Sequence, residues 1–95
     1  MALKKYDDVT WVTEYLNIIQ LPQDPKRRTS LWIVRTKYDE TLGNIHWFYW
    51  RKYVFAPVPG CVFESDCLRD IAQFIEERTN EYKKARQIIR YQAHA

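Results

Sequence analysis

The residues best suited to covalent or metal chemistry in this sequence are two cysteines, Cys61 and Cys67, and one histidine, His46. A Cys–His pair can form a nucleophile with its base, and the same side chains can bind zinc. A structural zinc site needs four ligands and usually a closely spaced cysteine pair, whereas five residues separate these two cysteines. The sequence therefore predicts no metal site, and both thiols are expected to be reduced packing residues.

Other catalytic patterns are also sparse. A helix start at Cys67 could lower the pKa of its thiol, but packing at the sheet–helix junction is the simpler interpretation. Glu76 and Glu77 are expected on a solvated helix face, and the chain has only two glycines, Gly43 and Gly60. Two glycines cannot make a glycine-rich phosphate loop. We predict that the protein is not an enzyme and carries no cofactor.

Composition favours binding over catalysis. Aromatic residues make up 16% of the 95 residues, which is more than so small a core is expected to hide. The net charge is +3, and the basic excess lies in the first 56 residues, most densely at Lys26–Arg28 and Arg51–Lys52. Exposed rings beside cations permit a polyanion as partner, although a bias this weak does not require one.

The stretch Trp47–Lys52 places four aromatic residues directly before two cations. Rings of this kind stack on nucleic-acid bases, and flanking cations contact phosphates. Trp47 and Phe55 are nevertheless expected in the core, whereas the residues at the turn are as well suited to the surface as to the interior. We predict that a nucleic acid or a nucleotide binds through the residues Trp50, Arg51, Lys52, Tyr53, Tyr49, Arg35, Lys26, Arg27 and Arg28.

Alternating side chains predict three strands that position these residues. Residues 31–38 form one strand, with Trp32 and Val34 on one face and Ile33 and Arg35 on the other. Residues 42–59 form a central hairpin that turns at the cations and ends at its prolines. Residues 22–30, with two prolines and a basic triplet, are expected to be a loop.

Residues 9–21 allow two interpretations. Their β-branched residues favour a strand, whereas Trp11, Tyr15 and Ile18 also fall at helical spacing. A helix here would give the α-β-β-β-α order of double-stranded-RNA-binding domains. We favour a strand in the second half that ends at Pro22, preceded by frayed residues 1–8.

A long amphipathic helix is predicted at the C-terminal end, capped by Ser65 or Asp66 and continuing to Tyr91. Its stripe contains Leu68, Ile71, Ala72, Ile75, Tyr82, Ala85 and Ile89. The predicted fold is α+β: a single domain, residues 1–95, with a four-stranded antiparallel sheet and this one helix, residues 65–91, packed on one face. The final helical turns are free to project or to pair with another subunit.

The hairpin and the helix start resemble a group of small uncharacterised proteins of phages and prophages. The matching residues are Leu42-Gly43-x-Ile45-x-Trp47, Trp50-Arg51-x-Tyr53-x-Phe55-x-Pro57, Phe63 and Cys67-Leu68-x-Asp70-Ile71-x-x-Phe74-Ile75. The resemblance implies four strands followed by a helix and an origin in a mobile element. It also favours a strand in residues 9–21, and it supplies no activity.

Three functions remain open on the sequence. The first is a phage-type, non-enzymatic binding protein for nucleic acid or a nucleotide, and the second is a protein–protein inhibitor that blocks a host factor, such as an immune enzyme. The third is self-assembly into a homodimer through the helix end or an exposed strand edge. Because the chain starts without a signal-like apolar run and has no membrane-length apolar segment, we expect it in the cytoplasm of a bacterial host, without a membrane partner.

Overall fold

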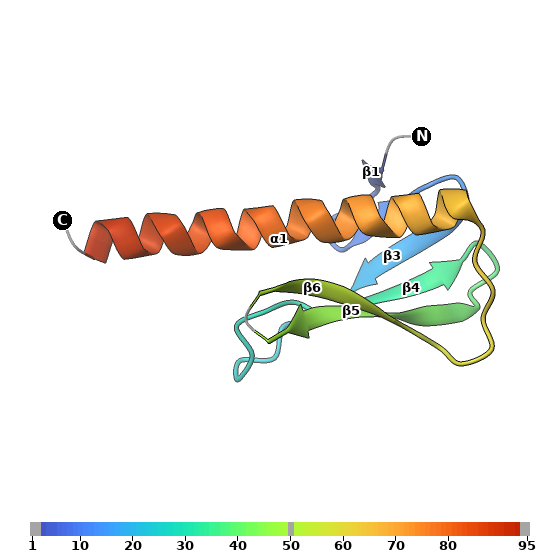
Figure 1. Cartoon of the computed structure of the whole chain (residues 1–95), viewed down its shortest axis with the longest axis horizontal. Helices are drawn as coiled ribbons and strands as arrows, with labels where there is room; N and C mark the ends of the chain where they lie inside the picture. The colour runs from blue at the N-terminus through green and yellow to red at the C-terminus, as the bar shows by residue number, and fades with distance from the viewer. Residues whose placement is uncertain (1–2, 50, 94–95) are drawn as a thin grey trace.

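The computed structural model of this chain describes the backbone of residues 3–49 and 51–93 and the side chains up to residue 87. Its elements are β1 (Lys4–Lys5), β2 (Thr10–Val12), β3 (Leu16–Gln20), β4 (Trp32–Thr36), β5 (Thr41–Phe48), β6 (Lys52–Pro57) and α1 (Ser65–Ala93). The strands form one antiparallel sheet in the order in which they occur along the chain. The helix lies across one face of this sheet and its C-terminal part extends past the sheet's edge (Figure 1).

The α+β class and the long C-terminal helix on an antiparallel sheet are confirmed, but the predicted number of four strands is wrong. The sheet of the described residues has six strands, because β2 and β3 both fall within residues 9–21 and β1 lies within residues 1–8. Strands of two and three residues are too short to show an alternating pattern. The expected strand in the second half of residues 9–21 is present as β3.

The turn between β2 and β3 explains why this hairpin was missed. Its sequence, Thr13-Glu14-Tyr15, has no glycine, proline or asparagine. The turn is closed by Thr13 instead: its backbone N–H donates to the carbonyl of Leu16 at 2.9 Å, and its hydroxyl accepts from the N–H of Leu16 at 3.1 Å. A threonine hydroxyl that substitutes for a backbone partner is a weaker turn signal than glycine or asparagine.

The turn between β1 and β2 is also closed by a side chain. The carboxylate of Asp7 accepts from the backbone N–H groups of Val9 and Thr10, both at 2.8 Å. These hydrogen bonds lower the pKa of Asp7, because they stabilise its charged form. The turn lets β1 pair with β2, with Lys5 opposite Trp11.

The core lies between the sheet and the first half of the helix. The strand residues Ile18, Val34 and Ile45 are fully buried, and α1 inserts Phe74 among them. The ring of Phe74 meets Trp32 edge to face, with ring centroids 5.1 Å apart, and Trp11 in the same way at 5.3 Å. Large rings in edge-to-face contact let a small domain bury much apolar area in few residues.

Gly43 lets β5 and β6 approach closely on the helix side of the sheet. A Cβ atom at this position would collide with the carbonyl oxygen of Ala56 and would lie 2.7 Å from the ring of Phe55. The register between β4 and β5 also shifts beside it, between Val34 and Arg35. A bulge of this kind increases the local twist, so the glycine and the shift together shape the hairpin under the helix.

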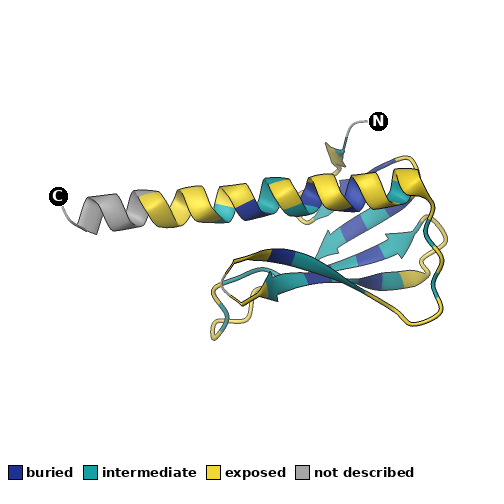
Figure 2. Ribbon diagram, viewed as in Figure 1, coloured by how far each residue is buried: buried dark blue, intermediate teal, exposed yellow. Residues whose placement is uncertain are grey.

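The helix covers only one face of the sheet. Residues that point to the other face, such as Ile19, Ile33 and Val54, are half-buried and are paired in rows across the strands. Figure 2 shows the resulting two layers: buried positions face each other between sheet and helix, whereas residues 83–87 of the helix, beyond the sheet, are exposed. No helix among the described residues is long and apolar enough to span a bilayer.

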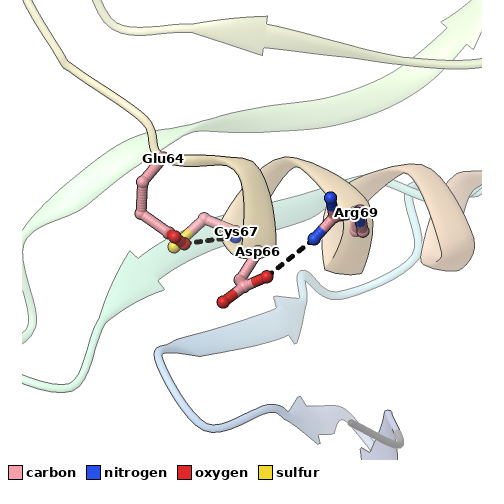
Figure 3. A network of polar contacts seen from close by, with 4 residues as sticks. All are labelled: Glu64, Asp66, Cys67 and Arg69. Carbon is pink, nitrogen blue, oxygen red and sulfur yellow. Dashed lines mark hydrogen bonds and ion pairs between the residues drawn. The ribbon is translucent and has the colours of Figure 1, made fainter.

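The helix begins at an unexpected capping residue. Glu64, not Ser65 or Asp66, accepts the backbone N–H of Cys67 on its side-chain Oε1 at 2.7 Å, and its carbonyl accepts the N–H of Leu68. Figure 3 shows this side chain pointing from the preceding loop to the backbone of Cys67, near the ion pair of Asp66 with Arg69. Glutamate is not among the preferred N-cap residues, so the pattern favoured its shorter neighbours.

Candidate functional site

A groove runs under the part of α1 that extends past the sheet. It has a volume of about 890 Å³ and lies between the helix, the end of β5 and the loop that joins β3 to β4. We call it the basic groove; it is lined by Lys26, Arg27, Arg28, Thr29, Trp47, Tyr82, Lys83, Arg86 and Gln87. Five of these described residues are cations and none is acidic. An arrangement of this kind attracts phosphate or carboxylate groups.

The loop that carries the basic triplet is braced by its own polar residues. The side-chain amide of Gln23 donates to the carbonyls of Arg27 and Thr29, the second at 3.3 Å. The carboxylate of Asp24 accepts the backbone N–H of Lys26 at 2.9 Å, and its carbonyl accepts that of Arg27 at 2.9 Å. The nearby acid is therefore engaged by a turn, and the loop's cations are not in an ion pair with any described carboxylate.

Tyr53 connects this loop to the sheet and the helix. Its hydroxyl accepts the backbone N–H of Ser30 at 3.1 Å, and its own N–H donates to the hydroxyl of Thr79 on α1, also at 3.1 Å. Burial raises the pKa of Tyr53, although the hydrogen bonds from Ser30 oppose that change. Of the two environments that the sequence left open for Tyr53, the structure has burial: only 3% of the residue is accessible, because its ring is packed edge to face against Trp32 and Trp47.

The aromatic wall of the basic groove comes from two elements. Trp47 of β5 and Tyr82 of α1 lie with ring centroids 4.6 Å apart and planes tilted by 49°. The guanidinium of Arg86 lies 5.9 Å from the centroid of the Tyr82 ring and donates to its hydroxyl at 3.3 Å. These contacts fix the rings and place a cation on the wall, which favours a flat, anionic ligand over an aliphatic one.

Of the predicted binding residues, Lys26, Arg27 and Arg28 line the basic groove. The sequence interpretation missed their partners Tyr82, Lys83 and Arg86, and it placed Tyr82 in the apolar stripe of the helix. The spacing of Tyr82 and Arg86 by one helical turn was the available signal. No local pattern, however, could place them opposite a loop more than fifty residues earlier.

Arg35 is not part of this groove. It belongs to the face of β4 opposite to that of Trp32 and Val34, which point toward the helix. Its Nε is buried and has no hydrogen-bond partner among the described residues. The structure therefore separates Arg35 from the other cations, as the alternation of side chains along β4 required.

The turn between β5 and β6 forms a separate surface, which we call the hairpin tip and define as Phe48–Lys52 without Trp50, because Trp50 lies outside the described residues. Tyr49 is 74% exposed, and its ring centroid lies 4.1 Å from that of Phe48. Arg51 and Lys52 are also exposed, and the N–H of Arg51 donates to the carbonyl of Phe48 at 3.1 Å. Tyr49 has a positive φ of 49°, which is uncommon for a residue with a bulky side chain.

The two cysteines lie at the opposite end of the sheet and are both free and half-buried. Desolvation raises the pKa of the Cys67 thiol to about 11, and the carboxylate of Glu64 adds to this effect. The possibility that the helix start lowers this pKa is therefore not realised, and the thiol is protonated at neutral pH. The side chain of His46 faces away from the helix and lies 2.7 Å, by its Nδ1, from Oδ1 of Asn44.

Within residues 3–49 and 51–93, no group of three or more potential ligands is arranged to hold a metal ion. The chain matches no protein-family model, no curated protein and no solved structure. The interpretation of the site consequently rests on its own geometry, in which five cations from two distant segments meet one aromatic wall.

Proposed function

We propose that this chain is a non-enzymatic binding protein that holds nucleic acid or a nucleotide in the basic groove. The observation that supports this most directly is the convergence of Lys26–Arg28 with Lys83 and Arg86 around the Trp47–Tyr82 wall. Cations alone would suit any polyanion, whereas cations beside a fixed pair of rings also suit the base of a nucleotide. The ligand's phosphates contact the cations while a base lies against the wall.

The energy available from base stacking favours a single-stranded ligand over a duplex. Stacking of one base on an aromatic ring contributes roughly 1–3 kcal/mol, and it requires a base that is free of its own stack. If all five cations contacted phosphates, the logarithm of the affinity would fall with the logarithm of salt at a slope of up to about −3.5. Charge and stacking together give a groove that binds measurably at low salt and weakly at high salt.

The test is a fluorescence titration with labelled single strands of DNA and RNA, a matched duplex and ATP. We expect the single strands to bind best and their affinity to fall steeply between about 50 and 200 mM salt. Absence of binding by all four probes at low salt would contradict the proposal.

Lys83 and Lys84 provide a matched pair of variants. They are adjacent and exposed on α1, but only Lys83 lines the basic groove. Lys83→Glu should weaken binding about tenfold and reduce the salt slope by about one, since one phosphate contact is lost. Lys84→Glu makes the same charge change away from the groove, so an equal effect would indicate nonspecific attraction.

A second candidate function is inhibition of a host protein, and the hairpin tip is the observation that favours it. Exposed aromatic residues next to an arginine are typical of the residues that dominate protein interfaces. The phage-like pattern in residues 42–75 supports a mobile-element origin for either function and, with it, action inside a bacterial cell. Recovery of a stoichiometric host protein that is lost with Tyr49→Asn would support inhibition, and absence of such a protein would count against it.

A further inference from the structure

A second groove lies at the end of the sheet that is remote from the basic groove. It has a volume of about 790 Å³ and is formed by the β2–β3 turn, the β4–β5 turn and the segment that leads into α1. We call it the acidic groove; it is lined by Glu14, Tyr15, Leu16, Thr36, Lys37, Tyr38, Glu40, Thr41, Leu42, Val58, Gly60, Cys61, Val62, Phe63 and Cys67.

Four apolar or aromatic residues of the acidic groove are open to solvent. Tyr38 is 93% exposed and Val62 is 92% exposed, and Tyr15 and Val58 are also in the exposed class. Single exposed apolar residues are ordinary, but several around one hollow form a patch that is typical of an interaction surface. The groove therefore has the exposed apolar residues that are typical of a protein–protein interface.

Carboxylates outnumber cations around this patch, by two to one among its lining residues. Glu14 and Glu40 line the groove, and neither is in an ion pair with a described cation. The charge of Glu14 is the main cause of the raised pKa of Tyr15, and the carboxylates of Asp66 and Glu64 contribute to it. The cation among the lining residues, Lys37, donates to Oδ1 of Asn17 at 2.8 Å. A partner for this groove should therefore combine apolar or aromatic side chains with positive charge.

The same chain carries such a surface at its other end. The hairpin tip presents the adjacent rings of Phe48 and Tyr49 together with the exposed cations Arg51 and Lys52. We propose that the acidic groove of one molecule docks the hairpin tip of a second copy. Opposite charges meet at the rim of this contact, and the two rings enter the apolar hollow.

The contact cannot form within one molecule. Thr41, at the start of β5, lines the acidic groove, whereas Phe48, at the end of the same strand, belongs to the hairpin tip. Seven strand steps separate these ends by about 24 Å, and Figure 1 shows the two turns at opposite ends of the sheet. Because groove and tip are different surfaces, the contact is head-to-tail: an open chain of molecules leaves one of each surface free at its ends, whereas a closed ring or a reciprocal pair leaves none.

Sedimentation velocity of the purified protein, freed of nucleic acid, tests this from low micromolar to millimolar concentration. We expect the average mass to rise with concentration above that of the monomer, continuously for an open chain and to a plateau for a closed assembly. A monomer over the whole range would overturn the proposal. The experiment contains no nucleic acid, so its outcome is independent of the function proposed for the basic groove.

Two variants identify the surfaces. Tyr49→Asn with Arg51→Glu removes the tip, and asparagine suits the positive φ at residue 49, so folding is preserved. The double substitution Val62→Lys with Glu40→Lys replaces one apolar and one acidic residue of the acidic groove with cations, at two exposed positions. Each should weaken self-association about tenfold or more. Tyr6→Asn, at an exposed tyrosine that lines neither groove, should leave it unchanged.

Mixing the two variants gives the sharpest result. The tip variant keeps an intact groove and the groove variant keeps an intact tip, so an equimolar mixture should form pairs of one molecule each and grow little beyond them. A mixture that stays monomeric, or variants that associate like the unaltered protein, would contradict docking between these two surfaces.

Discussion

The two grooves have similar volumes, about 890 and 790 Å³, but opposite chemistry. The basic groove joins cations to rings that are already fixed by other rings, with Trp47 held between Tyr53 and Tyr82. The acidic groove joins carboxylates to apolar side chains, such as Tyr38, that are almost fully exposed. A fixed wall with charge suits recognition of a flat anionic ligand, whereas an open apolar hollow suits a protein surface that covers it.

The helix α1 contributes lining residues to both grooves. The start of α1, from Glu64 to Asp70, carries acidic side chains, and its later turns carry Lys83, Lys84 and Arg86. The acidic side chains of the first turn oppose the positive end of the helix dipole and are favourable for the helix by itself. The helix therefore adds to a separation of charge that Glu14 and Glu40 of the turns and Lys26–Arg28 of the loop also produce.

The largest effect should come from disrupting the packing of α1 on the sheet, on which both grooves depend. Phe74→Ala removes a fully buried ring that packs on Trp11 and Trp32. We expect a loss of about 3–5 kcal/mol in the free energy of unfolding, measured by urea denaturation, because a cavity replaces the ring. Both nucleic-acid binding and self-association should fall together, since both grooves depend on the helix. A loss below about 1 kcal/mol would show that the helix is not held as described.

A smaller change should affect the basic groove alone. Tyr53→Phe keeps the packed ring but removes the hydroxyl that accepts the N–H of Ser30. We expect a loss of about 1 kcal/mol in stability and weaker oligonucleotide binding, because the loop with Lys26–Arg28 loses its anchor. Self-association should be unchanged. If binding were unaffected while stability fell, the anchor would be structural only and would not position the cations.

The smallest effect concerns the acidic end. The hydrogen bond from the Cys67 N–H holds the pKa of Glu64 below its ordinary value. Its charged form is thus favoured by folding, so this stabilisation is complete above the ordinary pKa and is lost as pH falls through the lowered one. Glu64→Gln should lower the melting temperature slightly at pH 7 and leave it unchanged at a pH below that lowered value. An equal decrease at both pH values would exclude a role for the charge.

The sequence was sufficient to predict the elements that repeat a pattern over several residues. Alternation placed Trp32 and Val34 on one face of β4, and both are buried under the helix. It was insufficient for β1 and β2, which are too short for a pattern and whose turns depend on the side chains of Asp7 and Thr13. Side chains such as Asp7 and Thr13 can be interpreted as turn-closing residues only when the pairing of the neighbouring strands is known.

The candidate site was predictable in part for a similar reason. The basic triplet was visible as a run of like charges, and the structure places all three cations in one groove. The wall was hidden, because Tyr82 looks like a member of an apolar stripe until the packing of α1 on β6 and Trp47 is known. The environment of Tyr53 could not be decided from its cationic neighbours, because its burial depends on rings of β4 and β5 and its hydroxyl accepts a hydrogen bond from the distant loop.

The extension of α1 past the sheet has an energetic consequence for any ligand of the basic groove. From Lys83 to Gln87 the helix is exposed on all sides, so its helicity there depends on backbone hydrogen bonds and intrinsic propensity. Turns without tertiary packing open at little cost in free energy. A ligand that binds Lys83 and Arg86 must order these turns, and the loss of conformational entropy opposes binding. Its affinity therefore depends on this cost as well as on the number of cations that it contacts.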